Sequence, residues 1–129
     1  MLRKRIISIS IFCLYIAAVA YLCFAKAEDL PKLSTTIFGI PADKAAHIIM
    51  FLPFPLLAYL VVEPARTKWY WKGLITFGIA VTGVGLAFLT EEIQAELTYR
   101  TKDIKDFLCD MYGLSAGIFI TIIYMLFRR

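Results

Sequence analysis

The polar residues of this apolar chain gather in two patterns whose residue types are suited to proton transfer and ligand binding. The first pattern is Asp43-Lys44-x-x-His47. The second runs from residue 91 to residue 113, and its members are Glu91, Gln94, Arg100, Asp106, Asp110 and Gly113. Both patterns border long hydrophobic stretches, and ionisable groups at the edge of a bilayer are costly to keep and usually serve a site. The sequence therefore predicts a functional polar site in a membrane protein.

Three of these residues are candidates for acid–base catalysis. His47 is the single histidine of the chain, and the ordinary pKa of histidine lies near neutrality, as a general base or proton shuttle requires. Glu91 and Asp106 are its candidate partners in proton transfer. In the structural alternative, His47 hydrogen-bonds to a neighbouring acid. Glu91 then pairs with Arg100 or Lys44 and holds the loop and the helices together.

The other polar residues are candidate ligand-binding groups. Arg100 can grip a phosphate or carboxylate through two parallel hydrogen bonds, and Lys44 offers a compact point charge. Gln94 is expected to orient a partner by hydrogen bonding and not to react. Either cation could instead form a salt bridge or reach toward the lipid headgroups. The predicted ligand-binding residues are Asp43, Lys44, Gln94, Arg100 and Asp110.

A divalent metal ion is a further candidate ligand, because carboxylates and imidazole are metal ligands. Asp106 and Asp110 would supply oxygen atoms, together with Glu91 and the nitrogen of His47. No compact metal-binding pattern such as His-Glu-x-x-His occurs in the sequence. We therefore predict no metal and no other cofactor.

The elements that must position these residues are long hydrophobic segments. The chain of 129 residues is 60% hydrophobic, with a mean hydropathy of +0.74, whereas soluble domains are roughly 45–50% apolar. Four segments reach the length of about 20 residues that a helix needs to cross a bilayer. We predict one all-α membrane domain over residues 1–129, a compact bundle with helices at about 6–25, 44–62, 73–91 and 106–127. Pro53 and Pro55 predict a kink in the second helix.

The distribution of cations predicts the orientation of these helices. The first segment has the basic start of a signal peptide, but its apolar run of about 20 residues exceeds the roughly 7–15 of such peptides, so we expect a retained helix. Eight lysines and arginines then lie on the side of the termini and six on the other side. The positive-inside rule therefore predicts cytoplasmic termini and an outward-facing polar site. The net charge of +4 reflects this topology, and no basic face with interleaved aromatic residues suggests nucleic-acid binding.

Residue counts place three polar groups at nearly one depth in the bilayer. His47, Glu91 and Asp110 each lie 18 or 19 positions from a cation at the other end of their predicted helix. At about 1.5 Å per residue, each is roughly 27–29 Å from the inner boundary of a core about 30 Å thick. Four packed helices could therefore bring them together. Gly113 and Gly117 form a surface of small residues that predicts close helix contact.

These residues resemble the VanZ-like family, small bacterial membrane proteins named after a teicoplanin-resistance protein. The family has an Asp-Lys-x-x-His box that opens its second helix, matched here at residues 43–47. Its Glu-x-x-Gln element, followed by Arg, Asp, Asn and Gly at fixed offsets, is matched at residues 91–113. Asp110 stands where the family usually has Asn. The resemblance covers about residues 41–117.

The resemblance implies a multi-pass protein of the bacterial inner membrane, linked to glycopeptide resistance, but it brings no established reaction. We expect a site that recognises a lipid-linked, phosphate-bearing or glycopeptide-related ligand. The alternative is a membrane enzyme that acts on a phospholipid or polyprenyl phosphate by acid–base chemistry. The expected partners are membrane lipids, a lipid-linked cell-wall precursor or a glycopeptide, and a second copy of the chain. A transporter is a weaker alternative, because the middle of every predicted span is free of charge.

Overall fold

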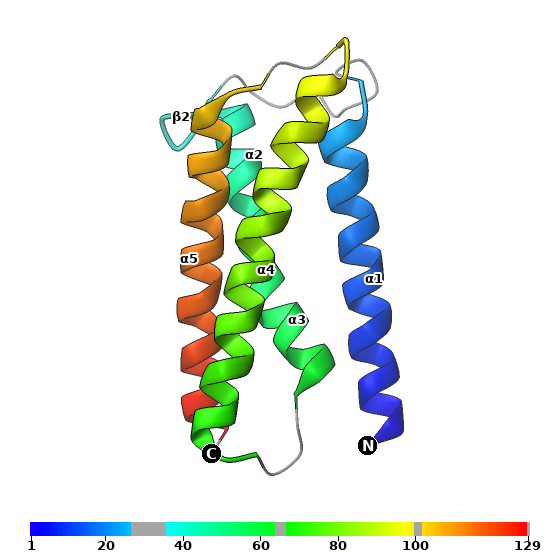
Figure 1. Cartoon of the computed structure of the whole chain (residues 1–129), viewed down its shortest axis with the longest axis vertical. Helices are drawn as coiled ribbons and strands as arrows, with labels where there is room; N and C mark the ends of the chain where they lie inside the picture. The colour runs from blue at the N-terminus through cyan, green and yellow to red at the C-terminus, as the bar shows by residue number, and fades with distance from the viewer. Residues whose placement is uncertain (27–35, 64–66, 100–101, 129) are drawn as a thin grey trace.

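The chain folds into long helices that lie side by side, with both termini at one end (Figure 1). The computed structural model describes residues 1–26, 36–63, 67–99 and 102–128. The elements in chain order are α1 (Leu2–Phe24), β1 (Thr36–Ile37), β2 (Ile40–Pro41), α2 (Ala42–Phe51), α3 (Phe54–Val62), α4 (Trp69–Glu96) and α5 (Ile104–Phe127). Within these described ranges, four helical segments are long and apolar enough to cross a membrane, with α2 and α3 together forming one of them. The predicted all-α class with four transmembrane helices is confirmed.

The second predicted helix is divided into α2 and α3. Pro53 and Pro55 lie at the start of α3, and a proline has no backbone N–H to continue the hydrogen-bond ladder of the preceding helix. The expected kink is therefore a break between two helices. The other helices extend beyond their predicted bounds, and α4 reaches from Trp69 to Glu96. Hydropathy marks the part of a helix within the hydrocarbon, whereas the hydrogen-bond ladder continues past it.

Helix α5 is the centre of the packing and contacts α2, α3 and α4. One apolar core consists of Phe54, Tyr59, Ile79, Leu114 and Met125. A second core contains Cys23, Met50, Phe51 and Ala87. Most large apolar side chains of α1 are exposed, and Cys23 is the buried residue of that helix. Such an outward apolar surface fits contact with lipid tails.

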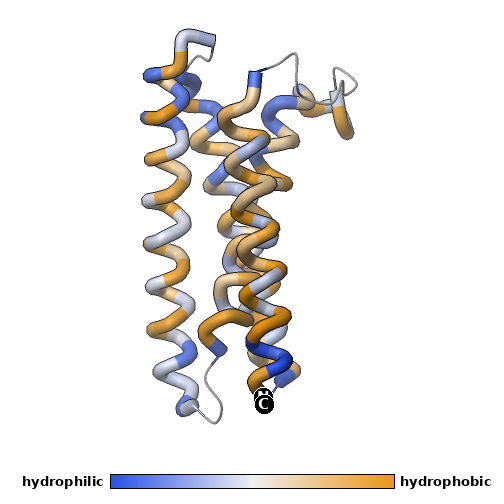
Figure 2. Tube along the Cα trace, turned by 90° about the vertical axis from the view of Figure 1, so that its right-hand side faces the viewer, coloured by the Kyte–Doolittle hydropathy of each residue, from blue (hydrophilic) through white to orange (hydrophobic). Residues whose placement is uncertain are grey.

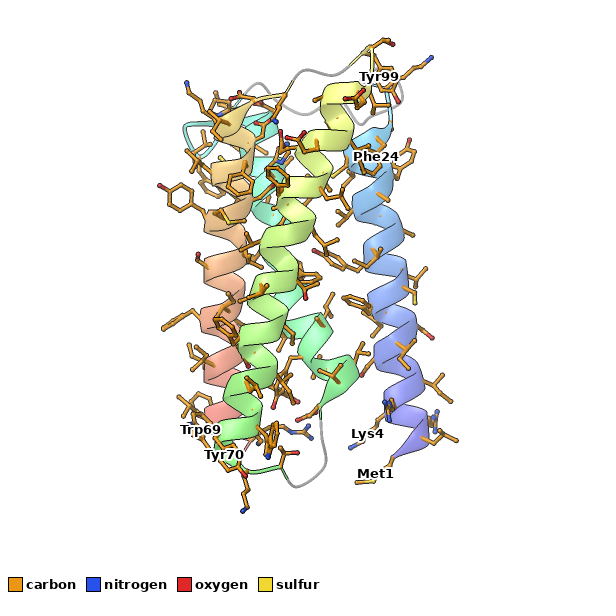
Figure 3. All side chains as sticks on the ribbon, in the orientation of Figure 1. Met1, Lys4, Phe24, Trp69, Tyr70 and Tyr99 are labelled. Carbon is orange, nitrogen blue, oxygen red and sulfur yellow. The ribbon has the colours of Figure 1, made fainter. Side chains whose placement is uncertain are left out.

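Polar and apolar residues divide along the length of the bundle (Figure 2). The most hydrophilic residues lie toward the two ends of the helices, and the middle is mostly hydrophobic. Met1 and Lys4 lie at the same end as Trp69 and Tyr70, while Tyr99 lies at the opposite end (Figure 3). Aromatic residues near helix ends are typical of membrane interfaces. The two ends of the bundle are thus distinct polar regions.

A short hairpin formed by β1 and β2 leads into α2. Thr36 pairs with Pro41, and Ile37 pairs with Ile40. The turn residues Phe38 and Gly39 both have positive φ angles, 51° and 76°, as a type I′ hairpin turn requires. The sequence analysis did not predict this hairpin. Its second strand ends at Pro41, and α2 begins at Ala42, the residue before Asp43.

Candidate functional site

Three helix ends lie at the end of the bundle opposite the chain termini (Figure 1), and their side chains form a polar cluster. The start of α2, the end of α4 and the start of α5 meet there. We define the polar cluster as Asp43, Lys44, His47, Glu91, Asp103, Asp106 and Asp110. Residues that are more than 40 positions apart in the sequence thus lie within interaction distance. Such contacts are consistent with the single bilayer depth that the residue counts predicted for these groups.

His47 is held by a buried carboxylate of α5. Its Nδ1 atom lies 2.8 Å from Oδ1 of Asp110, and the two residues are 7% and 0% exposed. The other ring nitrogen, Nε2, lies 3.6 Å from Oδ2 of Asp106, one helical turn before Asp110. Asp110 therefore fixes the orientation of the imidazole and directs Nε2 toward the interior of the cluster.

Glu91 is a buried carboxylate near the end of α4. The residue is 2% exposed, and neither of its carboxylate oxygens has a hydrogen-bond partner among the described residues. One of these oxygens lies within 4.8 Å of ligand atoms of both His47 and Asp106. The Oδ2 atom of Asp110 is likewise buried and without a partner in the described part of the chain. Buried polar groups are nearly always paired, so these carboxylate oxygens are unusual among the described residues.

Lys44 connects α2 to the start of α5 by ionic contacts. Its Nζ atom donates to Oδ2 of Asp103 at 2.7 Å and to Oδ1 of Asp106. It also lies 3.2 Å from Oδ2 of Asp43, whose side chain is 64% exposed. The hydrogen bond from Lys44 holds the pKa of Asp103 below its ordinary value. The charge of Lys44 is therefore already shared among three carboxylates.

The remaining predicted site residues either lie away from His47 or fall outside the residues that the structure describes. Gln94 is buried, and its Nε2 atom donates to the Cys23 carbonyl oxygen of α1 at 2.8 Å. Gly113 and Gly117 lie where α5 contacts α2 and the start of α3. Arg100 lies outside the residues that the structure describes.

Asp103 is a member of the cluster that was not predicted as a site residue. Its side chain caps the start of α5 by accepting a hydrogen bond from the Lys105 backbone N–H at 2.9 Å. Its contact with Lys44 was missed. The signal was the row of Asp103, Asp106 and Asp110, whose spacing of three and four residues places all three along one face of a helix.

A cavity of about 900 Å³ lies at the other end of the bundle. It is lined by α1, α3 and neighbouring cations, among them Lys4, Arg5 and Lys72. Its lining contains no predicted site residue and none of the polar cluster. We therefore place the candidate site by its side-chain chemistry and not by the size of a cavity.

The helices and the polar cluster define a multi-pass membrane protein with a polar site at one end of its bundle. A sequence model of the VanZ/LLP1 family matches residues 12–128, and the chain belongs to this VanZ-like family. An uncharacterized protein of Schizosaccharomyces pombe is 31% identical over 123 residues, which cover 95% of this chain. The chain spans 66% of the length of that relative. No solved structure matches the chain significantly.

Proposed function

We propose that the protein is a membrane enzyme that acts on the polar headgroup of an amphiphile such as a phospholipid or a polyprenyl phosphate. The observation that supports this function is the position of His47, with Asp110 behind it and with Glu91 and Asp106 near its free nitrogen. A histidine oriented by a carboxylate is found both in general bases and in metal ligands. Either role activates a hydroxyl group.

The location of the cluster at a helix end suits such a substrate. The ends of membrane-spanning helices lie near the headgroups, so the phosphate of an amphiphile can approach the cluster while its tails remain in the bilayer. The cation count favours the outer leaflet as the side of the reaction. In the proposed hydrolysis or transfer, a hydroxyl group loses a proton and attacks phosphorus. The ester P–O bond breaks, and the leaving oxygen gains a proton.

The experiment compares purified wild type with Glu91→Gln, His47→Gln and a matched control, Glu96→Gln. Glu96 is an exposed glutamate near the end of the same helix. Each protein is incubated with phospholipids and polyprenyl phosphates, and the products are identified by mass spectrometry. We expect product from wild type and from the control only, with all proteins equally folded. An inactive wild type, or an active Glu91→Gln variant, would contradict the proposal.

A second candidate function is recognition without turnover, and the contacts of Lys44 favour it. Because Lys44 bridges α2 and the start of α5, the cluster would also serve to shape a surface for a lipid-linked or glycopeptide-related ligand. Binding of such a ligand, without product, would then protect cells from teicoplanin. This function predicts that Glu91→Gln lowers the abundance of the protein and the teicoplanin resistance of cells together.

A further inference from the structure

Three side chains from three helices meet in the polar cluster with the chemistry of a metal site. One ligand atom each from His47, Glu91 and Asp106 lies within 4.8 Å of the others. In a tetrahedral zinc site, where each ligand atom is about 2.0–2.2 Å from the metal, neighbouring ligand atoms lie about 3.4 Å apart. Side-chain shifts on the order of 1 Å would therefore bring all three into coordination distance.

A second, independent observation is the absence of a partner for Glu91 in the described structure. Its carboxylate is buried, both oxygens are unpaired, and one of them faces the ligand atoms of His47 and Asp106. Burial of an unpaired carboxylate is strongly unfavourable unless a proton or a cation neutralises it. A bound cation would satisfy this residue.

The charge balance of the cluster also favours a cation. Five carboxylates accompany one lysine and one histidine, and Lys44 is bound to the carboxylates nearest the helix starts. The side chains of Asp103, Asp106 and Asp110 are 39%, 14% and 0% exposed. They form an acidic row that leads from the surface into the bundle, and such a row attracts cations.

We propose that His47, Glu91 and Asp106 bind a divalent transition-metal ion, Zn²⁺ or Mn²⁺. One nitrogen and two carboxylate oxygens suit these ions, and three protein ligands leave a position open for water or a phosphate oxygen. The contact between His47 Nδ1 and Asp110 matches the carboxylate that usually orients a metal-binding histidine. The use of the ion in a reaction rests on the proposed function, whereas its binding does not.

The test exploits the fact that the chain has a single histidine. Wild type is purified in detergent with a tag that contains no histidine, and metals are quantified by mass spectrometry before and after chelation. The stripped protein is loaded with Mn²⁺ or Cu²⁺ and examined by pulsed electron paramagnetic resonance. Coupling to an imidazole nitrogen would assign His47 as a ligand without any substitution.

Variants then test the two carboxylate ligands. We expect about one ion per chain in wild type and in the Glu96→Gln control, and at least tenfold weaker binding in Glu91→Gln and Asp106→Asn. Absence of imidazole coupling, or equal metal binding by all four proteins, would overturn the site. Product formation by metal-free wild type would overturn the role of the ion while the proposed function stands. Metal binding without product would leave the site intact and contradict that function.

Discussion

Gly113 of α5 lies directly against the backbone of Ile48 on α2. A Cβ atom placed on Gly113 would lie 2.2 Å from the Ile48 carbonyl oxygen. One turn further along both helices, a Cβ on Gly117 would lie 2.3 Å from the Leu52 oxygen. The two helices therefore run in the same direction in close contact. Because Ile48 follows His47 in the sequence, this contact also sets the distance between the His47 backbone and α5.

Alanine at position 113 is expected to push α2 away from α5. Since the clashing atom belongs to the backbone, no side chain can move aside, and overpacking of this kind costs roughly 1–3 kcal/mol. The control is Gly85→Ala on α4, where an added Cβ has no neighbour within 4 Å. Thermal unfolding in detergent should show a lower midpoint for Gly113→Ala only. Equal midpoints for the two variants would contradict the tight helix contact.

Replacement of Lys44 by methionine is expected to destabilise the fold. The substitution keeps the length of the side chain but leaves Asp103 and Asp106 without their cation, at a cost of roughly 1–3 kcal/mol. The control is Lys102→Met, because Lys102 forms a more exposed ion pair with Glu92 and such pairs contribute about 0–1 kcal/mol. Thermal unfolding at pH 7 distinguishes the two. A smaller loss for Lys44→Met than for the control would contradict a structural role of the Lys44 contacts.

Acidification is expected to remove the contribution of Asp103. Its pKa in the folded protein is lowered, chiefly by the hydrogen bond from Lys44, so its ionised form stabilises the fold. That contribution is fully present above the ordinary aspartate pKa of about 3.9, and it is lost as the pH falls through the lower folded value. Asp103→Asn keeps a helix-capping side chain and should be less stable than wild type at pH 7. The difference should shrink as the pH falls below the ordinary aspartate pKa, and a difference that does not shrink would contradict an ionic origin.

The sequence was sufficient to predict the membrane helices, and it singled out several polar residues that lie close together in the structure. Long apolar segments define spanning helices by length alone, and equal residue counts predicted the shared depth of His47, Glu91 and Asp110. Close contact at Gly113 and Gly117 was predicted, but the particular polar side chains that meet across the helices were not, because their meeting depends on the rotation of each helix about its axis. Asp43 and His47 are four residues apart, yet the Asp43 side chain is 64% exposed and His47 is buried. The rotation of α4 about its axis likewise directs the Gln94 side chain to α1, where it contacts the Cys23 carbonyl oxygen.

The role of Lys44 shows why residue type alone does not assign a ligand. A lysine beside a histidine in a membrane protein suggested a phosphate-binding charge. In the structure, the ammonium group of Lys44 already forms salt bridges with Asp103 and Asp106. An anionic headgroup would therefore need another positive charge, and a cation bound by His47 and Glu91 would provide it. The acidic excess of the cluster and a phosphate-bearing substrate are compatible if a metal ion lies between them.

Asp110→Asn tests this relationship and introduces the residue that the family usually has at that position. The Asn oxygen can still accept a hydrogen bond from His47 Nδ1, so the ring should keep its orientation. The negative charge behind the imidazole is lost, however, and metal affinity should fall about 10- to 100-fold. A neutral amide NH2 group replaces the buried Oδ2 atom, which lacks a partner among the described residues. Because no charge is then buried there, thermal stability in the absence of metal should be unchanged or higher.

The measurement for Asp110→Asn is a zinc competition titration against a chromophoric chelator, combined with thermal unfolding of the metal-free protein. Glu96→Gln again serves as the control, because its charge is removed from an exposed position outside the cluster. Weaker zinc binding with preserved stability would show that Asp110 acts on the metal through His47. Unchanged zinc affinity would contradict this role, because a carboxylate that orients a ligand histidine also raises its basicity. A large loss of stability would instead identify the charged His47–Asp110 pair as a structural contact.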